Sequence, residues 1–257
     1  MLAVNDVCKR FGGLRAVAAC SLDVKSGTIT GLIGPNGAGK TTLFNIITGF
    51  IRPDSGHIRL GDRDITALPP HRVFRRGVCR TFQIPRELAG MTVAENLMLV
   101  PRGQLGERLW NPFVRPIAVR RQERELRNKA LGVLDFLDLS HLADELARTL
   151  SGGQKKLLEL GRTLMAEPDI VLLDEPGAGV NRTLLKRLAD SIRTLRTELG
   201  LTFLVIEHDM DFVMRLCTPI IVMSEGCVLM EGDPTTVQRD QRVLNAYLGG
   251  QYVATTS

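Results

Sequence analysis

The chain has 257 residues, of which 44% are hydrophobic and 24% are charged, and its net charge is a modest +5. These values are typical of a globular protein that buries one large core, or one core with a subdomain. There is no apolar run long enough to cross a bilayer, no signal-peptide layout and no C-x-x-C pair among the five cysteines. We therefore expect a cytosolic chain with reduced thiols and no zinc site.

The N-terminal part of the chain predicts strands and a phosphate-binding loop. Alternating apolar and polar residues predict edge strands over 2–7 and 16–24. A strand over 29–33 then leads into Gly34-Pro35-Asn36-Gly37-Ala38-Gly39-Lys40-Thr41-Thr42, and a helix follows. This is the pattern G-x-x-x-x-G-K-[ST] in the strand–loop–helix context that a phosphate loop requires. A glycine-rich turn that binds nothing is the alternative, and it does not account for four fixed positions in that context.

The chemistry of this loop follows from its residue types. The glycines let backbone N–H groups converge on phosphate oxygens, and the helix N-terminus adds a partial positive charge. Lys40 would reach the β- and γ-phosphates, and the Thr41 hydroxyl would hold Mg²⁺.

The middle of the chain, about residues 83–166, has a helical pattern and is predicted to be an inserted subdomain. Thr92 with Glu95 three residues later is the signature of a capping box at a helix start. Residues 101–121 look irregular, and a helical pattern begins at Gln122. Residues 101–130 hold eight basic and three acidic side chains, a local net charge of +5. Such a segment suits nucleic acid or anionic lipid, or it is a solvated helix face.

Two further motifs carry candidate chemistry. Leu150-Ser151-Gly152-Gly153-Gln154 opens a helix predicted over 152–165, so Ser151 and the glycine amides form a second candidate anion site. An ordinary serine N-cap is the alternative.

The apolar strand over 170–173 ends in Asp174-Glu175. Asp174 is placed to organise Mg²⁺ and Glu175 to polarise a water that attacks the γ-phosphate, whereas the bland alternative is a solvated acidic turn.

The remaining pattern completes an alternation of strands and helices, which predicts an α/β fold with a mostly parallel sheet. The expected elements are a helix over 182–198, a strand over 201–206, a helix over 209–216 and a strand over 220–223. We expect one domain over 1–257, made of a sheet core of about 1–82 and 167–248, a helical subdomain of about 83–166 and a tail of 249–257.

The order of these motifs resembles that of ABC-type ATPases over essentially the whole chain. A phosphate loop is followed by Leu-Ser-Gly-Gly-Gln, by an apolar strand ending in Asp-Glu and by a strand ending in His208. Glu175 lies 21 residues after Gln154, as the layout of this family requires. The resemblance implies a P-loop ATPase with an N-terminal antiparallel β subdomain and an inserted helical subdomain. It also implies that the chain uses ATP and Mg²⁺.

The resemblance also implies roles for individual residues. Phe11 matches the aromatic side chain that stacks on adenine, and His208 matches a histidine that contacts the γ-phosphate. Gln83 matches a glutamine that senses Mg²⁺ and the attacking water, so the expected catalytic set is Glu175, His208 and Gln83. Thr41, Gln83 and Asp174 would hold Mg²⁺. Outside this resemblance, Phe11 would be a core residue and His208 a structural one.

In this family the Ser-Gly-Gly-Gln segment of one subunit closes on the ATP held by the phosphate loop of another. The resemblance therefore implies that Ser151, Gly152, Gly153 and Gln154 act on a partner's ATP and that the chain works as a dimer. Many relatives carry Asp where this chain has Asn181. The sequence therefore does not fix how strongly the two subunits of the dimer are coupled.

Local features resemble the ATPases of branched-chain amino-acid importers. They are Asn181 and the segments Arg10–Val17, Arg80–Gln83, Ile206–Met210 and Ala246–Gly249. The implied partners are two transmembrane permease subunits, a second ATPase subunit (a paralogue or a second copy) and, indirectly, an extracytoplasmic solute-binding protein, with no nucleic acid. The implied location is peripheral, on the cytoplasmic face of the inner membrane. A lipopolysaccharide-export-type ATPase and a soluble ABC ATPase without a transport role stay open as alternatives.

Overall fold

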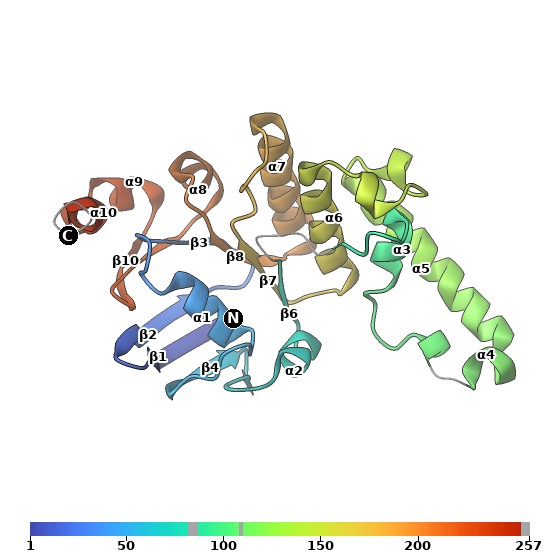
Figure 1. The fold of residues 1–257 in the computed structure, drawn as a ribbon, viewed down its shortest axis with the longest axis horizontal. Coiled ribbons are helices and arrows are strands. Elements are labelled where there is room, and N and C mark those ends of the chain that lie inside the picture. The colour runs from blue at the N-terminus through green and yellow to red at the C-terminus, as the bar shows by residue number, and fades with distance from the viewer. Residues whose placement is uncertain (82–86, 108–109, 253–257) are drawn as a thin grey trace. The chain divides into compact units, whose positions relative to one another are not determined.

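A computed structural model describes residues 1–81, 87–107 and 110–252 of the chain (Figure 1). The chain divides into two compact units. The first unit comprises residues 1–80, 169–177 and 192–257, and the second comprises residues 81–168 and 178–191. The sequence-based subdivision at residues 83 and 166 stays a prediction.

The larger sheet of the first unit contains the strands that precede the predicted motifs. Its strands are β3 (Ile29–Ile33), β6 (Val78–Arg80), β7 (Ile170–Asp174), β8 (Thr202–Ile206), β9 (Ile220–Ser224) and β10 (Cys227–Gly232). They lie in the order β10-β9-β3-β8-β7-β6, and only the β9–β10 pair is antiparallel. Every position of β3, β7 and β8 is buried, as expected for parallel strands covered on both faces. The predicted mostly parallel sheet is therefore confirmed.

The second sheet of this unit is antiparallel. Its strands are β1 (Leu2–Phe11), β2 (Leu14–Val24), β4 (Ser55–Leu60) and β5 (Arg63–Asp64), in the order β2-β1-β4-β5. The prediction of an edge strand over 2–7 is wrong, because β1 pairs with both β2 and β4. Sequence alternation reports which face of a strand is buried. It does not report whether both backbone edges are paired.

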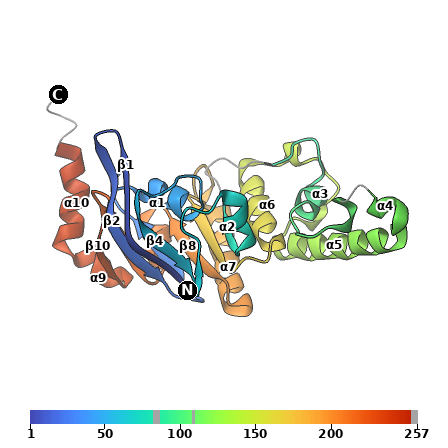
Figure 2. The same cartoon turned by 90° about the horizontal axis from the view of Figure 1, so that it is seen from below.

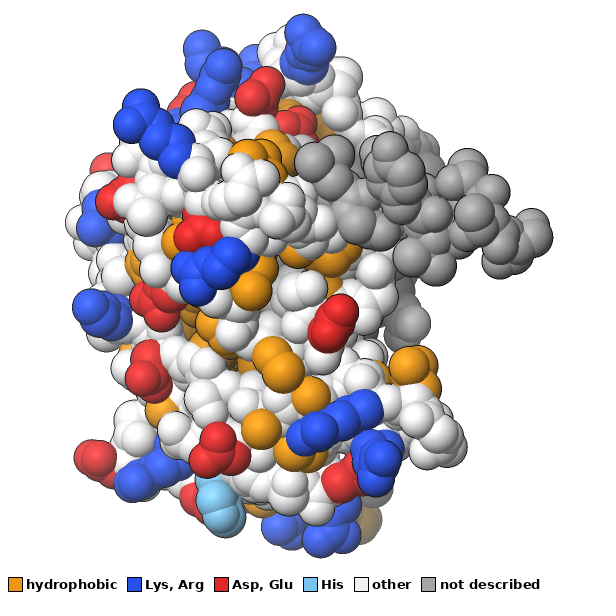
Figure 3. Space-filling model, turned by 90° about the vertical axis from the view of Figure 1, so that its left-hand side faces the viewer, with side chains coloured by type: hydrophobic (Ala, Val, Ile, Leu, Met, Phe, Trp, Pro, Cys, Tyr) orange, Lys and Arg blue, Asp and Glu red, His pale blue; other side chains and the backbone are white. Residues whose placement is uncertain are grey.

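One apolar cluster joins the two sheets to α1 (Lys40–Ile47), the helix that follows the glycine-rich loop. Phe44 and Ile47 of α1 are fully buried in the same cluster as Leu2 and Leu172. The other helices of the first unit are α2 (Pro70–Arg75), α8 (Met210–Leu216), α9 (Pro234–Arg239) and α10 (Gln241–Tyr252). Figure 2 shows α9 and α10 at the end of this unit that carries β10. On the face seen in Figure 3, side chains of both charges are intermingled with small hydrophobic patches.

The second unit is helical. Its helices are α3 (Val93–Met98), α4 (Asn111–Val114), α5 (Pro116–Phe136) and α6 (Gly152–Met165), and α7 (Arg182–Leu199) begins in it and ends in the first unit. The predicted capping box at Thr92 is confirmed, with Glu95 as its partner. The helices pack closely at Gly161, where an added Cβ would lie 2.9 Å from Leu137 Cδ1 and 3.1 Å from Leu97 Cδ2.

The start of α5 corrects the sequence interpretation. Helix α5 begins at Pro116, whereas the pattern predicted an irregular chain up to residue 121. Proline suits the first position of a helix because its missing N–H is not needed there. No helix in the described part of the chain is both long and apolar enough to span a membrane.

Candidate functional site

The carboxyl ends of three neighbouring strands of the parallel sheet carry the predicted site. The order β3-β8-β7 brings the loop after β3, Asp174 and Glu175 at the end of β7, and His208 after β8 to one edge of the sheet. Ligands of open α/β sheets bind at this kind of edge. All of these residues lie in the first unit.

The loop after β3 has a conformation that only glycine permits at two positions. Gly34 has a φ of 150°, and an added Cβ would lie 2.1 Å from the backbone oxygen of Met223. Gly39 has a φ of 96°, and an added Cβ would lie 2.4 Å from the backbone oxygen of Ala16. The loop therefore needs both glycines for steric reasons. Gly37 has open space around it, so only its φ of 81° favours glycine there.

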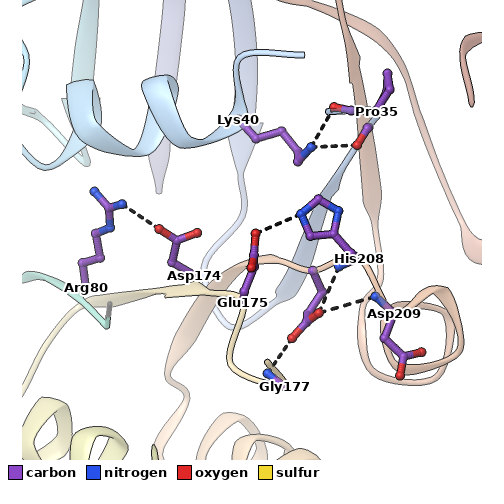
Figure 4. Close-up of polar contacts among 10 residues, drawn as sticks. Pro35, Lys40, Arg80, Asp174, Glu175, Gly177, His208 and Asp209 are labelled. Atoms are coloured by element: carbon purple, nitrogen blue, oxygen red, sulfur yellow. Dashed lines mark hydrogen bonds and ion pairs between the residues drawn. The ribbon is translucent and has the colours of Figure 1, made fainter. Parts of the chain in front are cut away.

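Lys40 begins α1, and its ammonium lies over the loop (Figure 4). The Nζ donates to the backbone oxygens of Gly34 at 2.7 Å and Pro35 at 3.0 Å. The residue is only 6% exposed, and this burial lowers the pKa of Lys40, while the charges of Glu175 and Asp174 partly oppose the shift. Two carbonyl oxygens thus hold the buried ammonium at the loop, where its positive charge can attract an anion.

Asp174 is 2% exposed and pairs with a residue that the motif analysis did not single out. Arg80, at the end of β6, places Nη2 2.6 Å from Asp174 Oδ2 and Nη1 2.6 Å from Asn45 Oδ1. Its guanidinium also lies over the ring of Phe44, 5.7 Å from the centroid. Arg80 thus fixes the Asp174 carboxylate (Figure 4). Only the parallel pairing of β6 with β7 brings them together, so no sequence spacing could reveal it.

Glu175 and His208 are in direct contact (Figure 4). Glu175 Oε1 lies 2.9 Å from His208 Nε2. Glu175 has a φ of 49°, unusual for a residue with a side chain, and its N–H donates to the backbone oxygen of Ile206 at 2.9 Å. Such strained backbone is concentrated at functional sites. The carboxylate and the imidazole are therefore held together where β7 and β8 end.

Glu207 is a second residue that sequence reasoning missed. It is 5% exposed, and its Oε1 accepts the N–H of Gly177 at 2.5 Å. Its Oε2 accepts the N–H of His208 at 2.9 Å. One buried carboxylate thus ties the loop after Glu175 to the loop that carries His208. The available signal was a carboxylate directly after a buried strand and before a candidate histidine.

Ser151 begins α6 in the second unit and forms a capping box. Its Oγ accepts the N–H of Gln154 at 3.3 Å, and Gln154 Oε1 accepts the N–H of Ser151 at 2.9 Å. Gly153 is buried against Leu184 of α7, because an added Cβ would lie 1.7 Å from Leu184 Cδ2. Gly152 is exposed, with open space around it. The Ser151 hydroxyl proton stays available to donate, since the cap uses only its oxygen.

Comparison with known proteins decides the family. Residues 17–178 match the family described as ABC transporter, and residues 227–253 match the family described as branched-chain amino acid ATP-binding cassette transporter. A probable branched-chain amino acid transport ATP-binding protein LivG of Archaeoglobus fulgidus is 41% identical over 98% of this chain and 96% of its own. The chain belongs to the ABC transporter family. It is an ATP-binding subunit with the ATPase activity of that family.

Solved structures of ABC ATPases have the same fold. The ADP conformation of MJ1267, an ATP-binding cassette of an ABC transporter, has a TM-score of 0.81 and 38% identity over 97% of this chain and 98% of its own. The dimeric structure of MJ0796, a bacterial ABC transporter cassette, has a TM-score of 0.75 and 25% identity over 91% of this chain and 99% of its own. Nucleotide binding and the predicted ABC ATPase fold are therefore shown.

One predicted nucleotide contact, Phe11, belongs to the antiparallel sheet. Phe11 ends β1 and is 47% exposed, with Lys9 Nζ 5.7 Å from its ring centroid, so its ring is accessible to a base. Gln83 lies outside the described residues. The oxygen donors of Thr41 and Asp174 are of the hard type that Mg²⁺ takes, so the residues of this ABC ATPase fit that ion.

Asn181 is the N-cap of α7. Its Oδ1 accepts the N–H of Leu184 at 2.9 Å, and its backbone oxygen accepts the N–H of Leu185 at 2.9 Å. Asparagine and aspartate are about equally good N-caps. The departure of this chain from the commoner Asp therefore keeps the helix start and changes only the charge there.

Proposed function

We propose that this chain is the ATP-hydrolysing subunit of an importer for branched-chain or related small amino acids. The match of residues 227–253 and the name of the Archaeoglobus relative support the solute class. The observation that carries the hydrolytic part is the contact of 2.9 Å between Glu175 Oε1 and His208 Nε2, at the same sheet edge as the phosphate loop.

Hydrolysis follows from the roles of these side chains. The backbone N–H groups of residues 34 and 36–42 and the Lys40 ammonium bind the phosphates, and Phe11 stacks on the adenine. Glu175 accepts a proton from the attacking water as the water oxygen bonds to the γ-phosphorus, and the bond from that phosphorus to the β–γ bridging oxygen breaks to release ADP. His208 orients Glu175 and reaches the γ-phosphate. Mg²⁺, held by Thr41, Asp174 and Gln83, would neutralise phosphate charge when bound.

A second ATPase subunit completes the site. The Ser151 hydroxyl and the Gly153 region of one subunit would donate to the γ-phosphate held by the other, because the hydroxyl proton of Ser151 is not used by its own cap. The dimeric form of the MJ0796 cassette supports such a pair. Closure of the pair on ATP would move two permease subunits at the cytoplasmic face of the membrane, with a solute-binding protein on the far side.

The Glu175→Gln variant tests the hydrolytic role. Glutamine keeps the size of the side chain but removes the charge that polarises water. We expect ATP binding to persist and turnover to fall by roughly 10²–10⁴-fold. Steady-state ATP hydrolysis and equilibrium nucleotide binding measure the two effects. Turnover near that of the native protein would refute the role of Glu175.

The same variant tests the transport role when it is tagged and trapped with ATP in native membranes. Mass spectrometry of the purified complex should find two polytopic subunits and a second ATPase. Recovery without membrane proteins would favour a soluble ABC ATPase. Recovery with export components would favour the lipopolysaccharide-export type. Either result would refute the importer.

Glu207 is proposed as a positioning residue. Glu207→Gln replaces one acceptor oxygen by an NH₂ group that faces a backbone N–H, so the two loops lose one of their ties. We expect turnover to fall by about tenfold with ATP affinity unchanged, since a lost hydrogen bond to a charged group is worth about 1.5–3 kcal/mol. Asp209→Asn is the matched control, because Asp209 caps α8 and asparagine caps equally well. Equal turnover in both variants would exclude this role.

A further inference from the structure

The most exposed large apolar side chains of the described residues occur together at the start of the long helix of the second unit. Trp110, Phe113, Val114 and Ile117 are 77%, 81%, 72% and 84% exposed. The next most exposed is Leu14, at 68%. Isolated exposed apolar residues are normal, but four within eight positions mark an interaction site.

These four side chains lie on two consecutive helices, which meet at the non-helical residue Arg115 (φ −133°, ψ 51°). Trp110, Phe113 and Val114 have the i, i+3, i+4 spacing of one face of α4, and Ile117 lies in the first turn of α5. Helical backbone bonds continue on both sides of Pro116, because Val114 N–H donates to Trp110 at 2.9 Å and Val119 N–H donates to Arg115 at 3.1 Å. Val119 is buried, and Asn111 donates to the Leu105 oxygen, so the other face packs on the unit. Figures 1 and 2 both show α4 at the N-terminal end of α5.

A basic stripe follows Ile117 along α5. Arg120, Arg121 and Arg124 stand three, four and seven residues after Ile117, and all three are exposed. Arg121 lies 3.7 Å from Glu125, one turn away. Among the described residues, Arg120 and Arg124 form no ion pair. The intermingled charges of Figure 3 contrast with this separation of apolar and basic side chains.

We propose that the exposed surface made of Trp110, Phe113, Ile117, Arg120 and Arg124 binds a bilayer that contains anionic phospholipid. Tryptophan and phenylalanine suit the boundary between headgroups and acyl chains, and arginine reaches phosphates from an apolar stem. Nucleic acid would satisfy the arginines but offers no apolar layer for Val114 and Ile117. The contact goes beyond the proposed transport function, because it needs neither nucleotide nor permease.

Trp110 gives a direct test, because it is the only tryptophan of the chain. The full-length protein is titrated with vesicles of phosphatidylcholine, with or without added phosphatidylglycerol. We expect the Trp110 emission to shift to shorter wavelength only with phosphatidylglycerol, and added salt should reverse the shift, because salt screens exposed charges. An equal response to both vesicles, or a response to an oligonucleotide instead, would overturn the proposal.

Substitutions then test which side chains bind the vesicle. Arg120→Ala with Arg124→Ala should weaken vesicle binding by roughly 25-fold, about fivefold for each arginine near an anionic surface. Phe113→Ser with Ile117→Ser should weaken it further. Arg63→Ala with Arg239→Ala is the matched control, since both residues are exposed and distant in sequence. Unaltered ATP hydrolysis and circular dichroism show that each variant is folded. Equal loss in the control would refute the assignment.

Discussion

The N-termini of α1 and α6 both have glycine at or next to the N-cap and both are candidate phosphate sites, yet their chemistry differs. The N-cap of α1 is Gly39 in a left-handed conformation, and no side chain caps the helix. The N-cap of α6 is Ser151, and a reciprocal capping box with Gln154 satisfies two N–H groups. The first helix start leaves its donors for a ligand, whereas the second is complete by itself and offers mainly one hydroxyl proton. This difference explains why the start of α1 would bind ATP by itself. The start of α6 would only add a donor to the ATP that another subunit binds.

The largest expected effect is on ATP affinity, at the uncapped N-terminus of α1. Lys40→Ala removes the buried ammonium of α1, and we expect ATP affinity to fall roughly a hundredfold, because a hydrogen bond to a charged group is worth about 1.5–3 kcal/mol. The matched control is Lys155→Ala in the first turn of α6, which removes an ion pair of 2.6 Å with Glu87 and should leave ATP affinity unchanged. Calorimetric titration of the isolated subunit measures both. Similar losses in the two variants would mean that the helix starts do not differ as argued.

A smaller effect is expected at the capped helix start. Ser151→Ala removes the cap and should lower the free energy of unfolding by about 1 kcal/mol, while ATP affinity of the isolated subunit stays constant. Gln154→Ala removes the other half of the box but keeps the Ser151 hydroxyl. In the assembled transporter Ser151→Ala should lower turnover more than Gln154→Ala does. If Gln154→Ala lowers turnover equally, the hydroxyl is not the group that acts on the partner's ATP.

The smallest effect is expected at the third helix start, that of α7. Asn181→Asp keeps the cap and should change the free energy of unfolding by no more than a few tenths of a kcal/mol, whereas Asn181→Ala should cost about 1 kcal/mol. Chemical denaturation of the native protein and the two variants measures these free energies of unfolding. An equal cost for Asp and Ala would show that the Asn181 side chain is needed for something other than its cap.

The sequence predicted the regular elements well because they depend on local patterns. The helix over 152–165 and the strand that ends at Asp174 have the predicted bounds within one residue, since a helical apolar period and a buried apolar run are local signals. The start of α5 was missed because Pro116 and the neighbouring arginines look irregular when read one by one. The site roles assigned to individual residues stay predictions until the variants are measured.

The sequence by itself determined the phosphate loop, the Asp-Glu strand end, the Ser-Gly-Gly-Gln segment and the alternation that implies a parallel sheet, because each is a short-range pattern. Only the tertiary structure decided that Arg80 holds Asp174, that Glu207 ties Gly177 to His208 and that β1 is an inner strand. Those contacts join residues 94 and 30 positions apart. Strand order, which the local pattern does not encode, brings them together.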